Sequence, residues 1–107
     1  MVAPKAEKLV ESSPKNQFRY QNGVYVGNMT SNNKKHGKGV MQYDDGRFYD
    51  GDWLNDFMHG KGVIHYRDGS SYEGDWLNGS MHGKGKYIDA KGKVFEGKFE
   101  YGMFKKP

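Results

Sequence analysis

The chain has 107 residues, of which 35% are hydrophobic and 15% aromatic, with 16 glycines and no cysteine. This length accommodates one domain, and abundant glycine with abundant aromatics favours a one-layer β structure over a helical bundle. The absence of cysteine excludes disulfides and thiolate metal sites. The 17 basic and 13 acidic residues are interleaved, which is typical of a mixed solvated surface, so we do not expect a nucleic-acid partner.

The first segment, residues 1–17, has neither periodicity nor a glycine-aromatic pattern. It contains Pro4 and Pro14 among mixed lysines and glutamates, a composition that predicts a flexible arm. No apolar stretch is long enough for a signal peptide or a membrane span. We therefore expect a cytoplasmic protein whose folded part begins at residue 18.

From residue 18 onward the sequence repeats. Residues 49–62 read YDGDWLNDFMHGKG and residues 72–85 read YEGDWLNGSMHGKG, so eleven of fourteen positions are identical at an offset of 23. The weaker flanking matches predict four units, of which the first is irregular and the last is cut short. Their approximate boundaries are 18–39, 40–62, 63–85 and 86–107.

A period of 23 is too short for a helix pair or a propeller blade but fits one β-hairpin per unit. Tight turns are predicted at the dipeptides Asn22–Gly23, Asp45–Gly46 and Asp68–Gly69. Longer connections are expected over Asn55–Gly60 and Asn78–Gly83. The predicted fold is all-β, an elongated single-layer antiparallel sheet of about eight strands, about 38 Å long at about 4.8 Å per strand.

Alternation within each predicted strand separates an aromatic face from a charged face. Tyr49, Gly51 and Trp53 alternate with Asp50 and Asp52, and pairing would set Gly60 and Gly62 near Trp53 and Gly51. Glycine would let the large rings lie flat across the neighbouring backbone. The predicted structural glycines are Gly51, Gly60, Gly62, Gly74, Gly83 and Gly85.

The charged face carries its own matching pattern. Pairing would bring Asp52 near Lys61 and Asp75 near Lys84. Exposed pairs of this kind contribute only about 0.2–1 kcal/mol each, so we expect them to set register and solubility rather than stability.

The unit Tyr-x-Gly-x-Trp-x-Asn-Gly, followed by His-Gly-x-Gly, resembles the MORN repeat (membrane occupation and recognition nexus). Every slot is matched in the third unit, by Tyr72, Gly74, Trp76, Asn78, Gly79, His82, Gly83 and Gly85. In the second unit Asp56 replaces one glycine. The resemblance covers about residues 20–102, and the ending GKYIDAKGKVFEGKF resembles the close of short MORN proteins of ciliated and sperm cells.

We find no catalytic or metal-binding pattern in the sequence. The equivalent His36, His59 and His82 would stand about 9.6 Å apart, too far to share a zinc ion with bonds of about 2.1 Å. A histidine that hydrogen-bonds its loop is the expected role. The tetrapeptide His-Gly-Lys-Gly lacks the spacing of a phosphate loop. The chain is therefore predicted not to be an enzyme and to need no cofactor or metal.

Most of the ring area on the aromatic face is expected to be structural core, with the rings packed on each other, and the remainder is predicted to form a shallow groove for an extended peptide or a helix of a partner protein. Tyr49 and Tyr72 are expected nearer its rim than the tryptophans. The groove residues are Tyr25, Tyr49, Trp53, Tyr66, Tyr72, Trp76, Phe95 and Phe99. A second contact is expected where the array stops, after one strand, at Gly102, because an open edge permits strand docking or a homodimer.

Two functions of different class remain open. The resemblance implies a protein-binding scaffold in a cytoskeletal assembly, since MORN proteins are frequent in radial spokes and other axonemal structures. It also allows a peripheral membrane or phosphoinositide-binding module, with a basic site formed by Lys34, Lys35, Lys38, Lys61 and Lys84. Neighbouring carboxylates weaken the field that such a site would offer to anionic lipids, which favours the scaffold.

Overall fold

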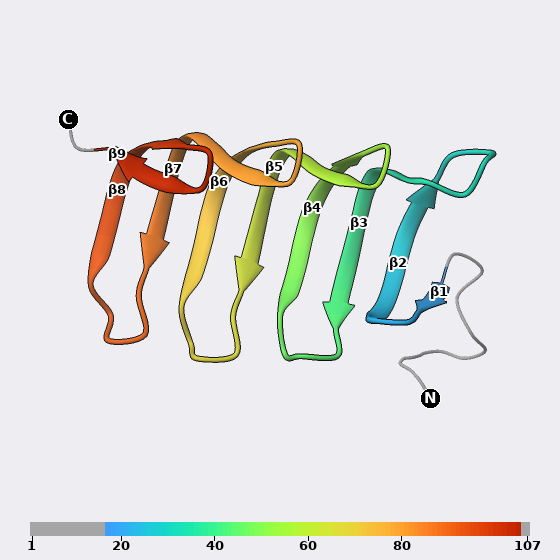
Figure 1. The fold of residues 1–107 in the computed structure, drawn as a ribbon, viewed down its shortest axis with the longest axis horizontal. Coiled ribbons are helices and arrows are strands. Elements are labelled where there is room, and N and C mark those ends of the chain that lie inside the picture. Colours follow the sequence, from blue (N-terminus) through green and yellow to red (C-terminus); the bar gives the residue numbers. More distant parts are fainter. Residues whose placement is uncertain (1–16, 106–107) are drawn as a thin grey trace.

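The computed structural model describes residues 17–105 as one antiparallel sheet whose nine strands follow chain order, without a helix (Figure 1). The strands are β1 (Gln17–Tyr20), β2 (Gly23–Met29), β3 (Lys35–Tyr43), β4 (Phe48–Leu54), β5 (Phe57–His65), β6 (Ser71–Leu77), β7 (Ser80–Ile88), β8 (Val94–Glu100) and β9 (Met103–Lys105). The sheet is elongated, with extents of 48 × 31 × 21 Å. The predicted all-β fold of consecutive hairpins is confirmed.

The two ends of the array differ from the prediction. The last unit does not stop at Gly102, because Met103–Lys105 folds back on β8 as a ninth strand. At the other end β1 begins at Gln17, which we had assigned to the arm. The rest of the predicted arm, residues 1–16, lies outside the described residues.

The tight turn predicted at Asn22–Gly23 is present as the two-residue turn Gln21–Asn22, but in the central units the two kinds of turn are the reverse of those expected. β4 and β5 are joined by the two-residue turn Asn55–Asp56, with φ of 47° and 75°, and Asn78–Gly79 repeats it with φ of 48° and 88°. Asparagine tolerates this left-handed conformation because its short polar side chain bonds locally. The loop around Asp45–Gly46 is instead four residues long, closed by the Tyr43 N–H donating to the Arg47 carbonyl at 2.8 Å.

A β-bulge follows the two-residue turns that join β4 to β5 and β6 to β7. Between β4 and β5 the register moves from Gly51 opposite Gly62 to Trp53 opposite Met58. Gly60 lies in the bulge with φ of 75°, a conformation that side chains rarely adopt. Gly62 therefore meets Gly51 as predicted, whereas the expected position of Gly60 beside Trp53 on this strand pair is wrong.

The core is a continuous ladder of edge-to-face aromatic rings. Trp76 stands between Tyr49 and Tyr72, with ring centroids 5.3 Å away on each side and interplanar angles of 87° and 88°. Edge-to-face pairs of this geometry add about 0.5–1.5 kcal/mol beyond burial. The full ladder runs Tyr25, Trp53, Tyr49, Trp76, Tyr72 and Phe99.

The polar atoms of the ladder are paired with the backbone. The Tyr49 hydroxyl donates to the Asp52 carbonyl at 2.8 Å. The Tyr72 hydroxyl donates in the same way to the Asp75 carbonyl, three residues further along the chain, at 2.9 Å. The Trp76 indole N–H donates to the Gly62 carbonyl at 3.0 Å. Because these polar groups have hydrogen-bond partners, tyrosine and tryptophan can be buried in a single-layer sheet without leaving an unpaired donor.

A row of glycines crosses seven strands at one level beneath the tyrosines. A Cβ at Gly62 would lie well under 3.0 Å from the Tyr49 ring, and one at Gly85 equally close to the Tyr72 ring. Gly62 and Gly85 thus have the predicted role of letting a large ring lie flat on the backbone, whereas Gly60 and Gly83 lie beside Asp52 and Asp75 with positive φ and carry no ring. The row consists of Gly27, Gly39, Gly51, Gly62, Gly74, Gly85 and Gly97.

Candidate binding surface

Six of the eight predicted groove residues are core residues rather than surface residues. Their exposed fractions are 0% for Tyr25, Tyr49 and Tyr72, 5% for Trp53 and Trp76, and 3% for Phe99. The expectation that the tyrosines lie nearer a rim than the tryptophans is wrong. Each tyrosine ring lies on the glycine row, and a tryptophan or phenylalanine of the next repeat packs edge-on against it.

Tyr66 and Phe95 remain partly exposed, and both line one hollow at the C-terminal end of the sheet. The hollow has a volume of about 480 Å³ and is walled mostly by apolar rings. The Phe95 ring lies 5.7 Å from that of Phe104 and 6.1 Å from that of Tyr87. The other lining residues are Asp68, Ser70, Met81, Phe99 and Gly102.

The sequence contained a signal for the hollow residues that the prediction missed. Tyr87 lies one period of 23 after Ile64, and Phe104 lies one period after Met81. Ile64 is buried in the middle of the array, whereas its equivalent Tyr87 near the end is partly exposed. Positions that form the core between two repeats become a surface where the repeats run out.

The buried tyrosines predict how the protein responds to alkali. Burial raises the pKa of Tyr25 and Tyr72 to about 12, from an ordinary value of 10.0. Above pH 10 the unfolded chain loses these protons first, so the free energy of unfolding falls as the pH rises from about 10 to about 12. In a spectroscopic titration, tyrosinate should form at higher pH in the folded protein than in the protein unfolded in urea. Tyr72→Phe should reduce this difference in pH. Superimposable folded and unfolded curves would contradict this prediction.

The tips of the hairpins carry a second set of exposed apolar side chains. Each two-residue turn also bonds to the preceding repeat: the Gly79 N–H donates to the Met58 carbonyl at 2.8 Å, and the Gly102 N–H to the Met81 carbonyl at 2.9 Å. These bonds tie successive tips together along one edge of the sheet. The exposed tip residues are Leu54, Phe57, Leu77, Tyr101 and Met103.

The equivalent histidines lie beside these tips. His59 accepts a hydrogen bond at Nδ1 from the Asn78 N–H at 3.5 Å, which is the loop-bonding role expected for it. The His82 ring packs 5.4 Å from the Tyr101 ring. Over residues 17–105 no three His, Asp or Glu side chains gather in a cluster that could hold a metal ion.

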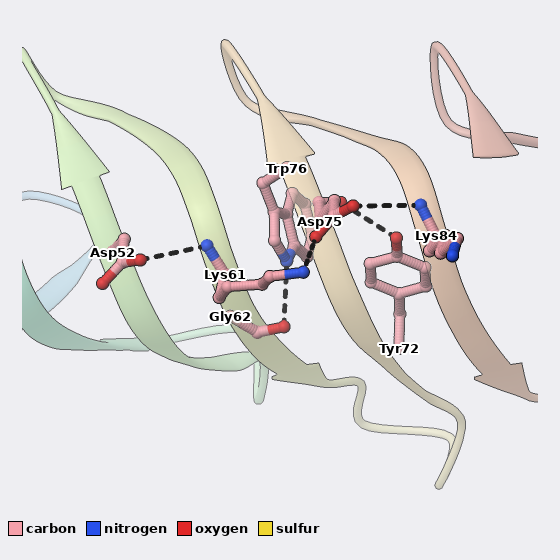
Figure 2. Close-up of polar contacts among 7 residues, drawn as sticks. All are labelled: Asp52, Lys61, Gly62, Tyr72, Asp75, Trp76 and Lys84. Carbon is pink, nitrogen blue, oxygen red and sulfur yellow. Dashed lines mark hydrogen bonds and ion pairs between the residues drawn. The ribbon is translucent and has the colours of Figure 1, made fainter. Parts of the chain in front are cut away.

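On the charged face the pairs are offset by one repeat from those expected. The Lys61 ammonium pairs with Asp75, whereas its backbone N–H donates to Asp52 at 3.0 Å (Figure 2). Asp52 therefore lies next to Lys61 as predicted, but the ion pair expected between its carboxylate and the Lys61 ammonium is wrong. The Asp52 carboxylate faces the bulge and accepts a hydrogen bond from the Lys61 backbone amide. The Lys61 side chain therefore reaches the next strand instead. The hydrogen bond from the Lys61 ammonium holds the pKa of Asp75 below its usual value.

Comparison with known proteins agrees with this repeat geometry. The family model for the MORN repeat matches residues 25–46, 49–71 and 72–94. The chain belongs to the MORN repeat family. MORN repeats form a binding module for proteins or membranes, and the family is generally non-catalytic. A search of individual curated proteins gives no match. In the part of this MORN chain that the structure describes, no helix is long and apolar enough to cross a membrane.

Proposed function

We propose that this MORN array is a non-catalytic protein-binding scaffold that holds an apolar anchor of its partner in the C-terminal hollow. The hollow carries the proposal because it joins, on one surface, partly exposed rings of β7, β8 and β9 with that of Tyr66 in the loop after β5. Aromatic side chains in a concave apolar surface are the usual source of affinity in protein interfaces. An extended peptide or a helix with one large apolar side chain fits this chemistry.

The scaffold is further proposed to be a structural component of a cytoplasmic, cytoskeletal assembly of axonemal type, such as a radial spoke. Support comes from the ending GKYIDAKGKVFEGKF, which is similar to the close of short MORN proteins of cilia and sperm. An elongated sheet with surfaces at both ends suits a structural spacer between other proteins. Imaging of the tagged protein in a ciliated cell tests this assignment, and a signal absent from the axoneme would contradict it.

The basic site proposed for membrane binding is weakened by the contacts of its lysines. Lys38 and Lys61 are paired with Asp52 and Asp75. The Lys35 side chain is only 13% exposed, with its ammonium 4.1 Å from the centre of the Tyr20 ring. Charges engaged in this way offer little field to anionic headgroups. Sedimentation with phosphoinositide vesicles at physiological salt should leave the protein in the supernatant, and co-sedimentation would favour the membrane function.

Partner capture should depend on the hollow and not on the charged face. Tyr66→Ala with Phe95→Ala removes two anchors, and truncating a central anchor costs about 2 kcal/mol, about a thirtyfold loss of affinity. Lys61→Glu with Lys84→Glu should change affinity only modestly because these charges are solvated. The measurement is a pull-down followed by titration of the recovered partner.

Phe57→Ala is the matched control for this experiment, since Phe57 is an aromatic residue 53% exposed on a hairpin tip outside the hollow. It should bind as wild type does. The proposal is wrong if the hollow variant, shown to be folded by circular dichroism, captures the partner normally. It is equally wrong if the lysine variant alone abolishes capture.

A further inference from the structure

Each end of the sheet carries only part of a strand. β1 covers residues 17–20 and pairs with residues 23–26 of β2. β9 covers residues 103–105 and pairs only with residues 98–100 of β8. Within residues 17–105, nothing pairs with the outer edge of β8 over residues 94–97. An unpaired edge of this kind is a template for another strand.

The two partial strands are complementary parts of the same repeat element. Phe18 of β1 is in phase with Ile64 and Tyr87, which lie in the part of β5 and β7 nearest the loops that follow these strands. Phe104 of β9 is in phase with Met81, which lies in the part of β7 nearest the hairpin tip. Placed end to end, β9 and a β1 strand would therefore complete one strand of the kind represented by β5 and β7.

The outward hydrogen-bonding groups of β8 can be identified from the ladder. The Asp89 N–H donates to the Lys93 carbonyl at 2.9 Å, which makes these two residues a hydrogen-bonded pair. Bonded and non-bonded pairs alternate along an antiparallel ladder, so Phe95 bonds to β7. The backbone N–H and C=O groups of Val94 and Glu96 consequently point to the outer edge.

The same alternation gives the outward groups of β1. The bonded pair of Tyr43 and Arg47 fixes which residues of β3 bond to β4 and which bond to β2. When the same alternation is followed along β2, the backbone groups of Tyr25 point toward β1. Its partner on β1 then bonds inward, and the residues on either side, Gln17 and Arg19, bond outward. Among residues 17–105 neither edge has a strand beside it, and each presents two residues with outward groups, separated by one residue whose groups point inward.

We propose that chains join head to tail, with β1 of a second copy adding to the free edge of β8 beside β9. In the register of the other repeats, Val94 would bond with Arg19 of the second copy, and Glu96 with Gln17 of the second copy. Phe18 of the second copy would then stand across from Phe95 and continue the aromatic row. A head-to-tail contact of this kind is heterologous, so each added copy offers a new free edge and assembly continues beyond the dimer, as a filament or, where the rotation between copies closes, as a ring.

Proline substitutions test this contact, because they remove one outward N–H while leaving the inward ladder bonded. In sedimentation velocity over a dilution series, the wild type should form species larger than a dimer as concentration rises. Glu96→Pro and Arg19→Pro should each remain monomeric. The matched controls Glu96→Ala and Arg19→Ala keep the N–H and should assemble as the wild type does.

Mixing the two proline variants separates this arrangement from others. Glu96→Pro keeps a working β1 edge and Arg19→Pro keeps a working β8 edge, so an equimolar mixture should form one-to-one dimers and nothing larger. A wild type that stays monomeric throughout, or Arg19→Pro chains that still self-associate, would overturn the proposal. Both variants retain Tyr66 and Phe95, so partner capture can be measured on them independently of assembly.

Discussion

Gly62→Val will lower the stability of the protein sharply, whereas Lys61→Ala beside it will change stability little. The substitution places a branched side chain where the Tyr49 ring lies on the backbone. Overpacking of this kind costs about 1–3 kcal/mol, and losing the hydrogen bond from the Tyr49 hydroxyl to Asp52 adds to the loss. Urea denaturation followed by circular dichroism measures the effect as a fall in the midpoint.

A double-mutant cycle shows whether the ring is the cause. In a Tyr49→Phe background the hydroxyl nearest the new side chain is gone, so Gly62→Ala should cost less there than in the wild type. Gly85 and Tyr72 repeat the arrangement and provide an independent copy of the experiment. Equal urea midpoints for Gly62→Val and the wild type would rule out this account of the glycine row.

The repeat period and the alternation within it were sufficient to predict the hairpins and the residues of each face. The bulge was not predictable, because strand alternation carries no information on the positive φ of Gly60. The predicted ion pairs differ from the observed ones by one repeat for the same reason, because the bulge places the Lys61 side chain beside Asp75. β9 could have been predicted from the sequence, because Tyr101–Gly102 lies one period after Asn78–Gly79 and marks another turn.

The completeness of burial on the aromatic face was the main point that could not be predicted from the sequence. Alternation places Tyr49 and Trp76 on one face but does not show that their rings lock edge-to-face across repeats. That packing depends on glycine allowing the tyrosine to lie flat, so that the next tryptophan can cover it. The candidate binding surface is therefore not the central rings but the hollow beside β8, where Phe95 stays partly exposed among the residues that the structure describes.

Tyr49→Ala combined with Tyr72→Ala is expected to unfold the protein rather than to isolate a binding defect. Both side chains are fully buried, and truncating a buried aromatic costs about 3–5 kcal/mol, against a typical total stability of about 5–15 kcal/mol. The two losses are also coupled, because both rings pack against Trp76. Circular dichroism at 25 °C should show loss of the strand signal, with no cooperative urea transition remaining.

Tyr101→Ala provides the control for the double variant, since Tyr101 is 75% exposed and its removal should leave the urea midpoint near that of the wild type. Tyr49→Phe gives the intermediate case: it keeps the ring but removes the hydroxyl that bonds to the Asp52 carbonyl, a loss of about 1–3 kcal/mol. The order of stability should be wild type, then Tyr49→Phe, then the double alanine variant. A double variant that unfolds cooperatively at the wild-type midpoint would mean that these tyrosines are not the core, and they would become candidates for partner contacts again.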